Sequence, residues 1–496
     1  MNQKNIQNKV ISGIGWSSFS SIISYLLIFS RIFILVRFLS PDDFGIMALS
    51  LMLLAVMKQF SHVGLEQAVI QEENISEQTI NTVWTVSIIR GVIFFALINI
   101  FTPFYANYFN ESELVSILTI LSFSAIFNGL KNSYISIAEK NMRFDVLFKL
   151  NVSSNLVEFI TSVVLAIIYQ NVIALAIGYL ASSIIGMVLS FFLLKDRPSF
   201  TFNMNEFFKL FKFGKWVFGS GMLVFLILNI DTTVIGKILG VTMLGFYQIA
   251  FRLGNFAATD IVLAFSRAIY PSFSLVKQDL NILKNYFLTT ILLISIITLP
   301  IMLIIGFYAE SFVTYFIGNN WLEVIVPLKI LVVFGIIRAI ASVCGYVFWA
   351  LGKPKIATNI SFFQLILISI IILPFTYQYG VIGTAISVTI PLLISSFISF
   401  YYVALELKIK LKDCIEFLSS AFISIVFLVI TIFIMRWQFD YIDSIFLFLV
   451  NATVVLTAYS LYLLFFDYFG RRKVINIVKE VWQLFIKRKK SIKDEL

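Results

Sequence analysis

The chain has 496 residues and a mean hydropathy of +0.95, with 59% hydrophobic and only 13% charged residues. Apolar runs recur along its whole length, which excludes a sizeable soluble domain. The net charge of +10 lies in short connections and at the two ends, so it does not indicate a nucleic-acid-binding face. Composition therefore predicts an all-α integral membrane protein.

Hydropathy also predicts the number of membrane spans. A spanning helix needs about 20 predominantly apolar residues, and on that criterion the sequence contains about fourteen such segments. In chain order they are 12–37, 44–66, 80–103, 114–137, 146–168, 172–194, 214–238, 243–266, 286–308, 325–350, 357–377, 380–403, 417–436 and 444–466. The longest polar stretches are 195–213 and 467–496.

Lysine and arginine are concentrated in every second connection between the predicted spans and in the two ends. Lys195 and Arg197 belong to one such connection, and the tail is rich in both residue types. The intervening connections, such as 104–113 and 309–324, are nearly free of them. By the positive-inside rule, both termini are predicted to be cytoplasmic, which fits an even number of spans.

The two halves of the chain resemble each other at an offset of 200 residues. Residues 37–50 (RFLSPDDFGIMALS) align with residues 237–250 (KILGVTMLGFYQIA), which places Gly45 on Gly245. About six spans separate the copies, and an even number predicts parallel repeats related by an axis along the membrane normal. Chance similarity between two membrane sequences is the alternative.

A repeat of this kind predicts two pseudo-symmetric six-helix lobes followed by a terminal helix pair. The predicted parts are an N-lobe at 1–195, a cytoplasmic amphipathic linker at 196–213, a C-lobe at 214–403, two further spans at 404–466, and a basic amphipathic cytoplasmic tail at 467–496. The linker and tail mix aromatic and aliphatic residues with lysine, which favours helices lying in the membrane interface. For the tail, attraction to anionic lipid and docking of a partner both stay open.

Basic residues occur inside the predicted spans. They are Arg31, Lys58, Arg90, Lys131, Arg252, Lys329 and Arg338. A charge at bilayer depth is costly and usually faces a wet cavity, so this set indicates a pathway for an anionic cargo. Arg90 and Arg338 lie near mid-span, where a side chain does not reach the surface. Lys131 and Lys329 are closer to span ends and can extend to the membrane surface instead.

Acidic residues offer partners for these cations. Asp231 is the repeat counterpart of Arg31, and an inter-lobe ion pair is the alternative to phosphate binding by Arg31. Asp260 follows Arg252 closely enough for partial pairing, and Glu158 is a further carboxylate within a span. We interpret these carboxylates as candidates for ion coupling or ion pairing.

Lys58, His62 and Glu66 are spaced by four residues and therefore share one face of a predicted helix. A stabilising ladder of charges explains this spacing. A proton relay through His62, which is the only histidine of the chain, is the alternative.

Features of an enzyme are scarce. Cys344 and Cys414 are the only cysteines and have no metal-ligand spacing, and no cofactor site is predicted. Asp42 and Asp43 would be metal ligands in a membrane glycosyltransferase, but they follow Pro41 in a tight connection where capping of the next helix explains them. We therefore predict that the protein is not an enzyme.

Residues 30–71 resemble the first two spans of Wzx-type polysaccharide flippases, which belong to a superfamily with the multidrug (MATE) exporters and the lipid II flippase. The shared features are an arginine, a short connection ending in Phe-Gly, a long apolar run, Gly-Leu, and a final Ala-Val-Ile-Gln. In this chain they are Arg37, Phe44, Gly45, Gly64, Leu65, Ala68, Val69, Ile70 and Gln71. The predicted span number and lobes extend the resemblance over the whole chain.

The resemblance implies transport by alternating access of undecaprenyl-diphosphate-linked oligosaccharide across the bacterial inner membrane, for lipopolysaccharide or exopolysaccharide biosynthesis. It implies a monomer in membrane lipid, with the polysaccharide polymerase and chain-length proteins as candidate partners. The cargo's diphosphate would bind Arg31, Arg90, Arg252, Arg338 and Lys58. The alternative function is a MATE-type multidrug or cation antiporter, and the excess of cations over carboxylates in the spans favours the flippase.

Overall fold

A computed structural model of the chain describes residues 23–61, 69, 75–141, 143–262, 269, 272–438 and 444–469. Regular secondary structure within these residues is helical, without strands. The elements are a helix at Ile23–Leu35, α2 (Pro41–Ser61), α4 (Glu77–Phe109), α5 (Glu113–Leu130), α6 (Ile135–Lys140), α7 (Phe144–Tyr169), α8 (Ile173–Leu193), α9 (Met204–Ile238), α10 (Val241–Gly254), η1 (Ala257–Ile261), α12 (Leu280–Phe307), α13 (Ala309–Phe312), η2 (Val313–Ile317), η3 (Asn319–Val324), α14 (Ile325–Ala350), α15 (Pro354–Glu406), α16 (Leu411–Gln438) and α17 (Ile445–Phe469).

These helices confirm the predicted class. Among the described residues, eight helical segments are long and apolar enough to cross a membrane. In lipid a backbone must satisfy its own hydrogen bonds, and a helix does so within one segment. The chain is therefore an all-α, multi-pass membrane protein. The number of helices does not equal the number of spans, because α15 alone contains two of the predicted segments. The number of fourteen spans therefore stays a prediction.

The 53-residue helix α15 is a hairpin of two helical arms. Gly380 interrupts it with φ 60° and ψ −138°. Ser387 Oγ donates to the carbonyl of Ile371 at 3.5 Å, which brings the two arms together. Lys353 and Glu406, at the two ends of α15, are joined by an ion pair of 2.6 Å. A straight helix of this length would separate its ends by about 80 Å.

The start of α2 shows why its acidic residues are there. Asp43 Oδ2 accepts hydrogen bonds from the backbone N–H of Ser40 at 2.8 Å and from its hydroxyl at 2.7 Å. Asp43 N–H faces Ser40 Oγ at 3.4 Å in return. This reciprocal arrangement is a capping box, so the capping role predicted for the Asp42–Asp43 pair is confirmed for Asp43.

The chain divides into two compact units. Unit 1 comprises 1–253, 316–330 and 358–395, and unit 2 comprises 254–315, 331–357 and 396–496. These units interleave along the chain, and the lobe boundaries near residues 195 and 214 stay a prediction.

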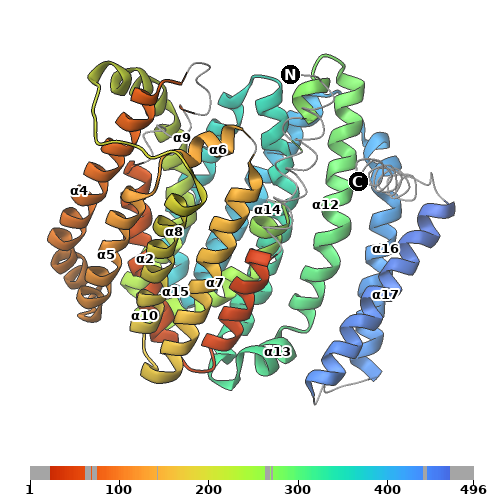
Figure 1. The fold of residues 1–496 in the computed structure, drawn as a ribbon. Coiled ribbons are helices and arrows are strands. Elements are labelled where there is room, and N and C mark those ends of the chain that lie inside the picture. The colour runs from red at the N-terminus through yellow and green to blue at the C-terminus, as the bar shows by residue number, and fades with distance from the viewer. Residues whose placement is uncertain are drawn as a thin grey trace, which may run out of the picture. The chain divides into compact units, whose positions relative to one another are not determined.

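In unit 1, small residues allow neighbouring helices to approach closely. A Cβ on Gly91 of α4 would lie 2.6 Å from the carbonyl oxygen of Ala125 on α5. A Cβ on Gly178 of α8 would lie 2.8 Å from the Cβ of Ser162 on α7. Lipid tails are as apolar as the side chains, so close packing of this kind is a main source of helix association in a membrane. Figure 1 shows α4 beside α5 and α7 beside α8.

The first turns of α2 and α10 cross in unit 1 with reciprocal geometry. A Cβ on Gly45 would overlap the carbonyl oxygen of Val241, and a Cβ on Gly245 would overlap that of Pro41. Both helices therefore begin at positions 200 residues apart and meet through glycines 200 residues apart. This exchange of equivalent contacts agrees with the predicted repeat.

Trp321 of η3 packs against the same crossing. Its ring meets Phe44 of α2 at a centroid distance of 5.3 Å and Phe246 of α10 at 5.8 Å, both nearly perpendicular. Its Nε1–H donates to the carbonyl of Val36 at 3.0 Å. A buried tryptophan thus covers the crossing with its polar atom satisfied.

The predicted linker at 196–213 has two different structures. Residues 196–203 contain no helix and lie against α4: Ser199 N–H donates to Asn81 Oδ1 at 2.8 Å, and Thr85 Oγ1 donates to the carbonyl of Thr201 at 2.8 Å. From Met204 onward the backbone belongs to α9, which continues into the predicted seventh span.

In unit 2, α16 lies along α12 and is attached to it near both ends. Lys284 pairs with Asp413 at 3.0 Å, and Arg436 Nη1 donates to the carbonyl of Phe307 at 3.2 Å. Figure 1 shows α16 and α17 as neighbouring helices next to α12. The terminal helix pair predicted at 404–466 therefore exists as two packed helices.

Candidate functional site

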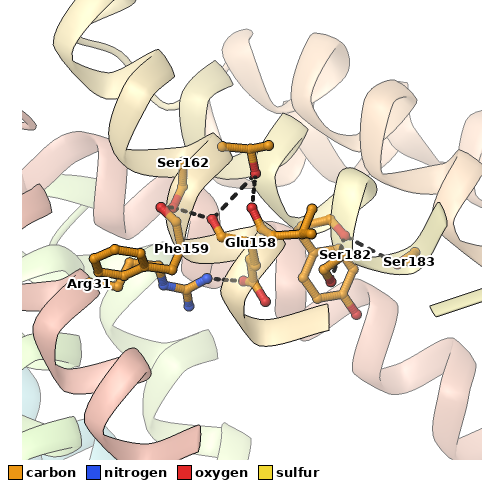
Figure 2. A network of polar contacts seen from close by, with 9 residues as sticks. Arg31, Glu158, Phe159, Ser162, Ser182 and Ser183 are labelled. Carbon is orange, nitrogen blue, oxygen red and sulfur yellow. Dashed lines mark hydrogen bonds and ion pairs between the residues drawn. The ribbon is translucent and has the colours of Figure 1, made fainter. Parts of the chain in front are cut away.

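Within unit 1, Arg31 forms an ion pair between two helices. It lies on the helix Ile23–Leu35, and its Nη1 forms an ion pair with Glu158 Oε1 of α7. The side chains are 22% and 17% exposed, so both charges are largely removed from the surface. Figure 2 shows Arg31 reaching Glu158 from the neighbouring helix. The sequence predicted both residues as candidates without pairing them, and Arg31 pairs with Glu158 instead of with Asp231.

The seam between α7 and α8 is polar around this ion pair. Ser162 Oγ donates to the carbonyl of Glu158 at 2.6 Å. On α8, the hydroxyls of Ser182 and Ser183 donate to the carbonyl of Tyr179 at 3.1 and 3.2 Å (Figure 2). Each of these hydroxyls donates to a carbonyl of its own helix, so none is left without an acceptor. The ion pair therefore lies in a polar part of an otherwise apolar bundle.

Arg252 also contacts the helix that carries Arg31. Its guanidinium carbon lies 5.5 Å from the ring centroid of Phe29, within the range of a cation–π interaction. Phe29 and Arg31 are two residues apart, which separates them by about 200° around a helix. Arg252 and Glu158 therefore contact different faces of this helix.

Asp231 of α9 is buried within a hydrogen-bond network. Its Oδ2 accepts from Tyr247 Oη at 2.7 Å, and its Oδ1 accepts from the backbone N–H of Thr232 at 2.7 Å. Gln248 Nε2 extends the network to Thr232 Oγ1 at 2.9 Å. Within the described residues no cation lies at ion-pair distance from Asp231, and the hydrogen-bond donors compensate for the burial of its carboxylate.

In unit 2, Arg338 lies beside an interruption between helical segments. Asn255 follows α10 and precedes the π-helical turn η1, and its Oδ1 accepts from Arg338 Nη1 at 3.1 Å. A Cβ on Gly335 of α14 would overlap the carbonyl oxygen of Gly254, so α14 crosses this point closely. π-Helical turns occur often at functional sites.

The structure describes the side chains of three further predicted residues and not those of four others. Arg90 is half-buried on α4, and Lys329 is exposed on α14. The half-buried side chain of Lys131 lies beside Gly186 of α8. Lys58 and Asp260 lie in α2 and η1, but their side chains, like His62 and Glu66, are outside the described residues.

Sequence reasoning missed several residues of these networks. Tyr179, Tyr247 and Asn255 are not among the residues predicted from the sequence. Asn255 carried a usable signal, since an amide within a predicted apolar span needs a hydrogen-bond partner. The tyrosines carried none, because membrane helices contain many aromatic residues. In the described part of the chain, no cluster of three His, Cys, Asp or Glu residues has the arrangement of a metal site.

Comparison with known proteins decides the family. The model of the family described as "Polysaccharide biosynthesis protein" matches residues 34–326, which is more than half of the chain. The chain belongs to this polysaccharide biosynthesis protein family. The Wzx-type resemblance of residues 30–71 is thereby confirmed.

Individual relatives and a solved structure agree with this family. An uncharacterized membrane protein in the cps region of Klebsiella pneumoniae is 25% identical over 445 residues, covering 89% of this chain and 91% of the relative. The lipopolysaccharide biosynthesis protein WzxC of Escherichia coli (strain K12) is 22% identical, covering 80% and 81%. The lipid II flippase MurJ in an inward closed conformation has 18% identity and a TM-score of 0.75, covering 91% of this chain and 98% of MurJ. The likeness to MurJ shows that this chain has the fold of that protein.

Proposed function

We propose that the protein translocates undecaprenyl-diphosphate-linked oligosaccharide repeat units across the bacterial inner membrane, for the biosynthesis of a surface polysaccharide. The observation that carries the proposal is the family match over residues 34–326 together with arginines inside the apolar helices. Relatives that cover most of the chain have names that place them in polysaccharide biosynthesis.

The cations are suited to the head group of such a cargo. A diphosphate carries about two negative charges, and arginine offers a planar fork that matches phosphate oxygens. In unit 1, Arg31 lies on the helix Ile23–Leu35 and Arg252 contacts Phe29 of the same helix, and both arginines are half-buried. We assign diphosphate binding to these two arginines and keep Arg90 and Arg338 as further candidates.

Export of cationic drugs is the competing function. It would use unpaired carboxylates within the helices. Glu158 is paired with Arg31, and Asp231 accepts hydrogen bonds from Tyr247 and Thr232. Neither carboxylate is thus presented to a cationic ligand in this structure, which supports the anionic cargo.

The proposal includes an orientation and a setting. Both termini lie in the cytoplasm, because the lysine- and arginine-rich connections alternate with connections that nearly lack these residues. The protein acts as a monomer in membrane lipid, takes its cargo from the cytoplasmic leaflet, and delivers it to the polymerase and chain-length proteins outside. It performs no covalent chemistry.

Deletion of the gene tests the function. We expect undecaprenyl-diphosphate oligosaccharide to accumulate on the cytoplasmic side, surface polysaccharide to be lost, and drug tolerance to stay unchanged. Mass spectrometry of the lipid-linked oligosaccharides identifies the repeat unit. A deletion strain with normal surface polysaccharide and heightened dye sensitivity would overturn the proposal in favour of drug export.

A further inference from the structure

The ion pair between Arg31 and Glu158 has a consequence for any anion that binds Arg31. Both side chains are mostly buried, and the Arg31 Nη1 is directed at Glu158 Oε1. A phosphate group that binds Arg31 through Nη1 must therefore compete with a carboxylate that is already within the protein. Removing one partner of a buried ion pair leaves the other charge uncompensated, so the displaced Glu158 needs a new partner.

The backbone around Glu158 is held independently of the ion pair. Ser162 Oγ donates to the carbonyl of Glu158, and Ser162 itself packs against Gly178 of α8. The hydrogen bond lies within α7, the packing of Ser162 against Gly178 joins α7 to α8, and neither uses the Glu158 carboxylate. The side chain is therefore able to exchange partners while the helix stays in place.

A second cation lies one helical turn along the same seam. A Cβ on Gly186 of α8 would lie 3.2 Å from Lys131 Nζ and also 3.2 Å from Ser154 Oγ of α7. Ser154 precedes Glu158 by four residues, so the two share one face of α7 with a rise of about 6 Å. A glutamate side chain that leaves Arg31 can turn toward the Lys131 ammonium.

We propose that Glu158 is a positioning residue that sets the anion selectivity of Arg31, and that it moves to Lys131 when a diphosphate takes its place. The inference rests on the proposed diphosphate-linked cargo. A phospholipid phosphodiester such as phosphatidylglycerol carries one negative charge, whereas the linkage in the cargo carries about two. Glu158 excludes the abundant singly charged head group, and the doubly charged one displaces it.

Ligand binding to the purified full chain tests this selectivity. Native mass spectrometry is used to titrate undecaprenyl diphosphate and phosphatidylglycerol separately. We expect the wild type to prefer undecaprenyl diphosphate by about tenfold or more, and Glu158→Gln to bind both lipids more tightly with a preference below about threefold. Adding Arg31→Ala to Glu158→Gln should abolish the tighter binding of both lipids, because the Arg31 guanidinium provides that binding.

Lys131→Met tests the second half of the exchange. It should weaken binding of undecaprenyl diphosphate in the wild-type background, where Glu158 needs a new partner, but not in the Glu158→Gln background. Glu406→Gln is the matched control, because it breaks a carboxylate–lysine pair in unit 2 and should keep the wild-type preference. An equal effect of Lys131→Met in both backgrounds would overturn the move to Lys131.

Thermal unfolding separates selectivity from a purely structural ion pair. If the ion pair is only structural, Glu158→Gln should lower the Tm and leave the ratio of the two lipid affinities unchanged. That outcome would overturn the selectivity inference and leave the proposed cargo standing. If the wild type does not bind undecaprenyl diphosphate, the proposed cargo fails and the inference fails with it.

Discussion

At the residue scale, polar and charged groups within the apolar helices are matched by partners on other elements. Asp231 and Glu158 illustrate this: one accepts from Tyr247 on another helix, and the other pairs with Arg31. Among the described residues, only the hydroxyls of Tyr308 and Tyr459 are buried without a hydrogen-bond partner. Burial of an unpartnered polar group is expensive, so such networks determine how the helices are placed.

Removing the donor to Asp231 should destabilise the protein. Tyr247→Phe leaves the buried carboxylate with the Thr232 donors alone, and we expect it to lower the free energy of unfolding by about 1–3 kcal/mol. Thermal unfolding in detergent measures the effect. Replacing both residues, as Asp231→Leu with Tyr247→Phe, should cost less than the sum of the two single changes. Additive costs would contradict the network.

Neutralising the other candidate arginines tests the cationic pathway. Arg90→Ala together with Arg338→Ala should reduce surface polysaccharide by about tenfold or more, with the protein still present in the membrane, because charge at bilayer depth is retained for function. Lys329→Ala is the control, since Lys329 is exposed on α14. Export at the wild-type level by the double variant would count against a role for these two residues.

At the element scale, the contacts between helices depend on small residues at a few positions. α2 and α10 meet through Gly45 and Gly245, and α14 meets the end of α10 through Gly335. At each of these points an added methyl group would overlap a carbonyl oxygen of the neighbouring chain segment. These crossings therefore cannot relax by a change of side-chain rotamer alone.

Alanine at either glycine of the first crossing should open it. We expect Gly45→Ala and Gly245→Ala each to lower the free energy of unfolding by about 1–3 kcal/mol or more. Gly345→Ala in α14 is the matched control, because a Cβ there has no neighbour within 4 Å. It should be neutral or stabilising by about 0.5–1 kcal/mol, as alanine favours helix. Equal Tm shifts for all three variants would refute the close crossing.

The attachment of α16 to α12 should depend on pH through Asp413. A hydrogen bond from the backbone N–H of Lys410 and then the Lys284 ammonium lower the Asp413 pKa below its usual 3.8. Because the folded pKa is lowered, the stabilising contribution is present above pH 3.8 and is lost as the pH falls through the lowered value. Asp413→Asn should therefore lower Tm at pH 6 and leave it unchanged at a pH below both values. A persistent difference in acid would argue against this linkage.

At the scale of the whole molecule, the alternation of charged and uncharged connections predicts the orientation. Ser199 lies in the extended stretch before α9, and Ser112 lies in the connection between α4 and α5; both are exposed. In a chain without native cysteines, an impermeant maleimide should label Ser112→Cys in intact spheroplasts. It should label Ser199→Cys only after the membrane is disrupted. The reverse pattern would invert the proposed orientation.

Much of the architecture follows from the sequence by itself. Long apolar runs must be helical in lipid, because a helix satisfies its backbone hydrogen bonds locally, and this predicted the helical class and most helix positions. The offset of 200 residues predicted equivalent positions in α2 and α10, and Gly45 and Gly245 do exchange equivalent contacts. The presence of arginine within the spans was also evident, since charge contrasts sharply with its apolar surroundings.

The tertiary structure decided which groups meet. Glu158 rather than Asp231 pairs with Arg31, and Asn255 accepts a hydrogen bond from Arg338. The sequence alone did not predict either pairing. Local periodicity gives the face of a helix on which a residue lies, but the partner of that face is set by packing between segments far apart in the chain. Within α15, the spans predicted at 357–377 and 380–403 already implied a turn, and the structure adds its place at Gly380 and the contact between Ser387 and Ile371 that joins the two arms.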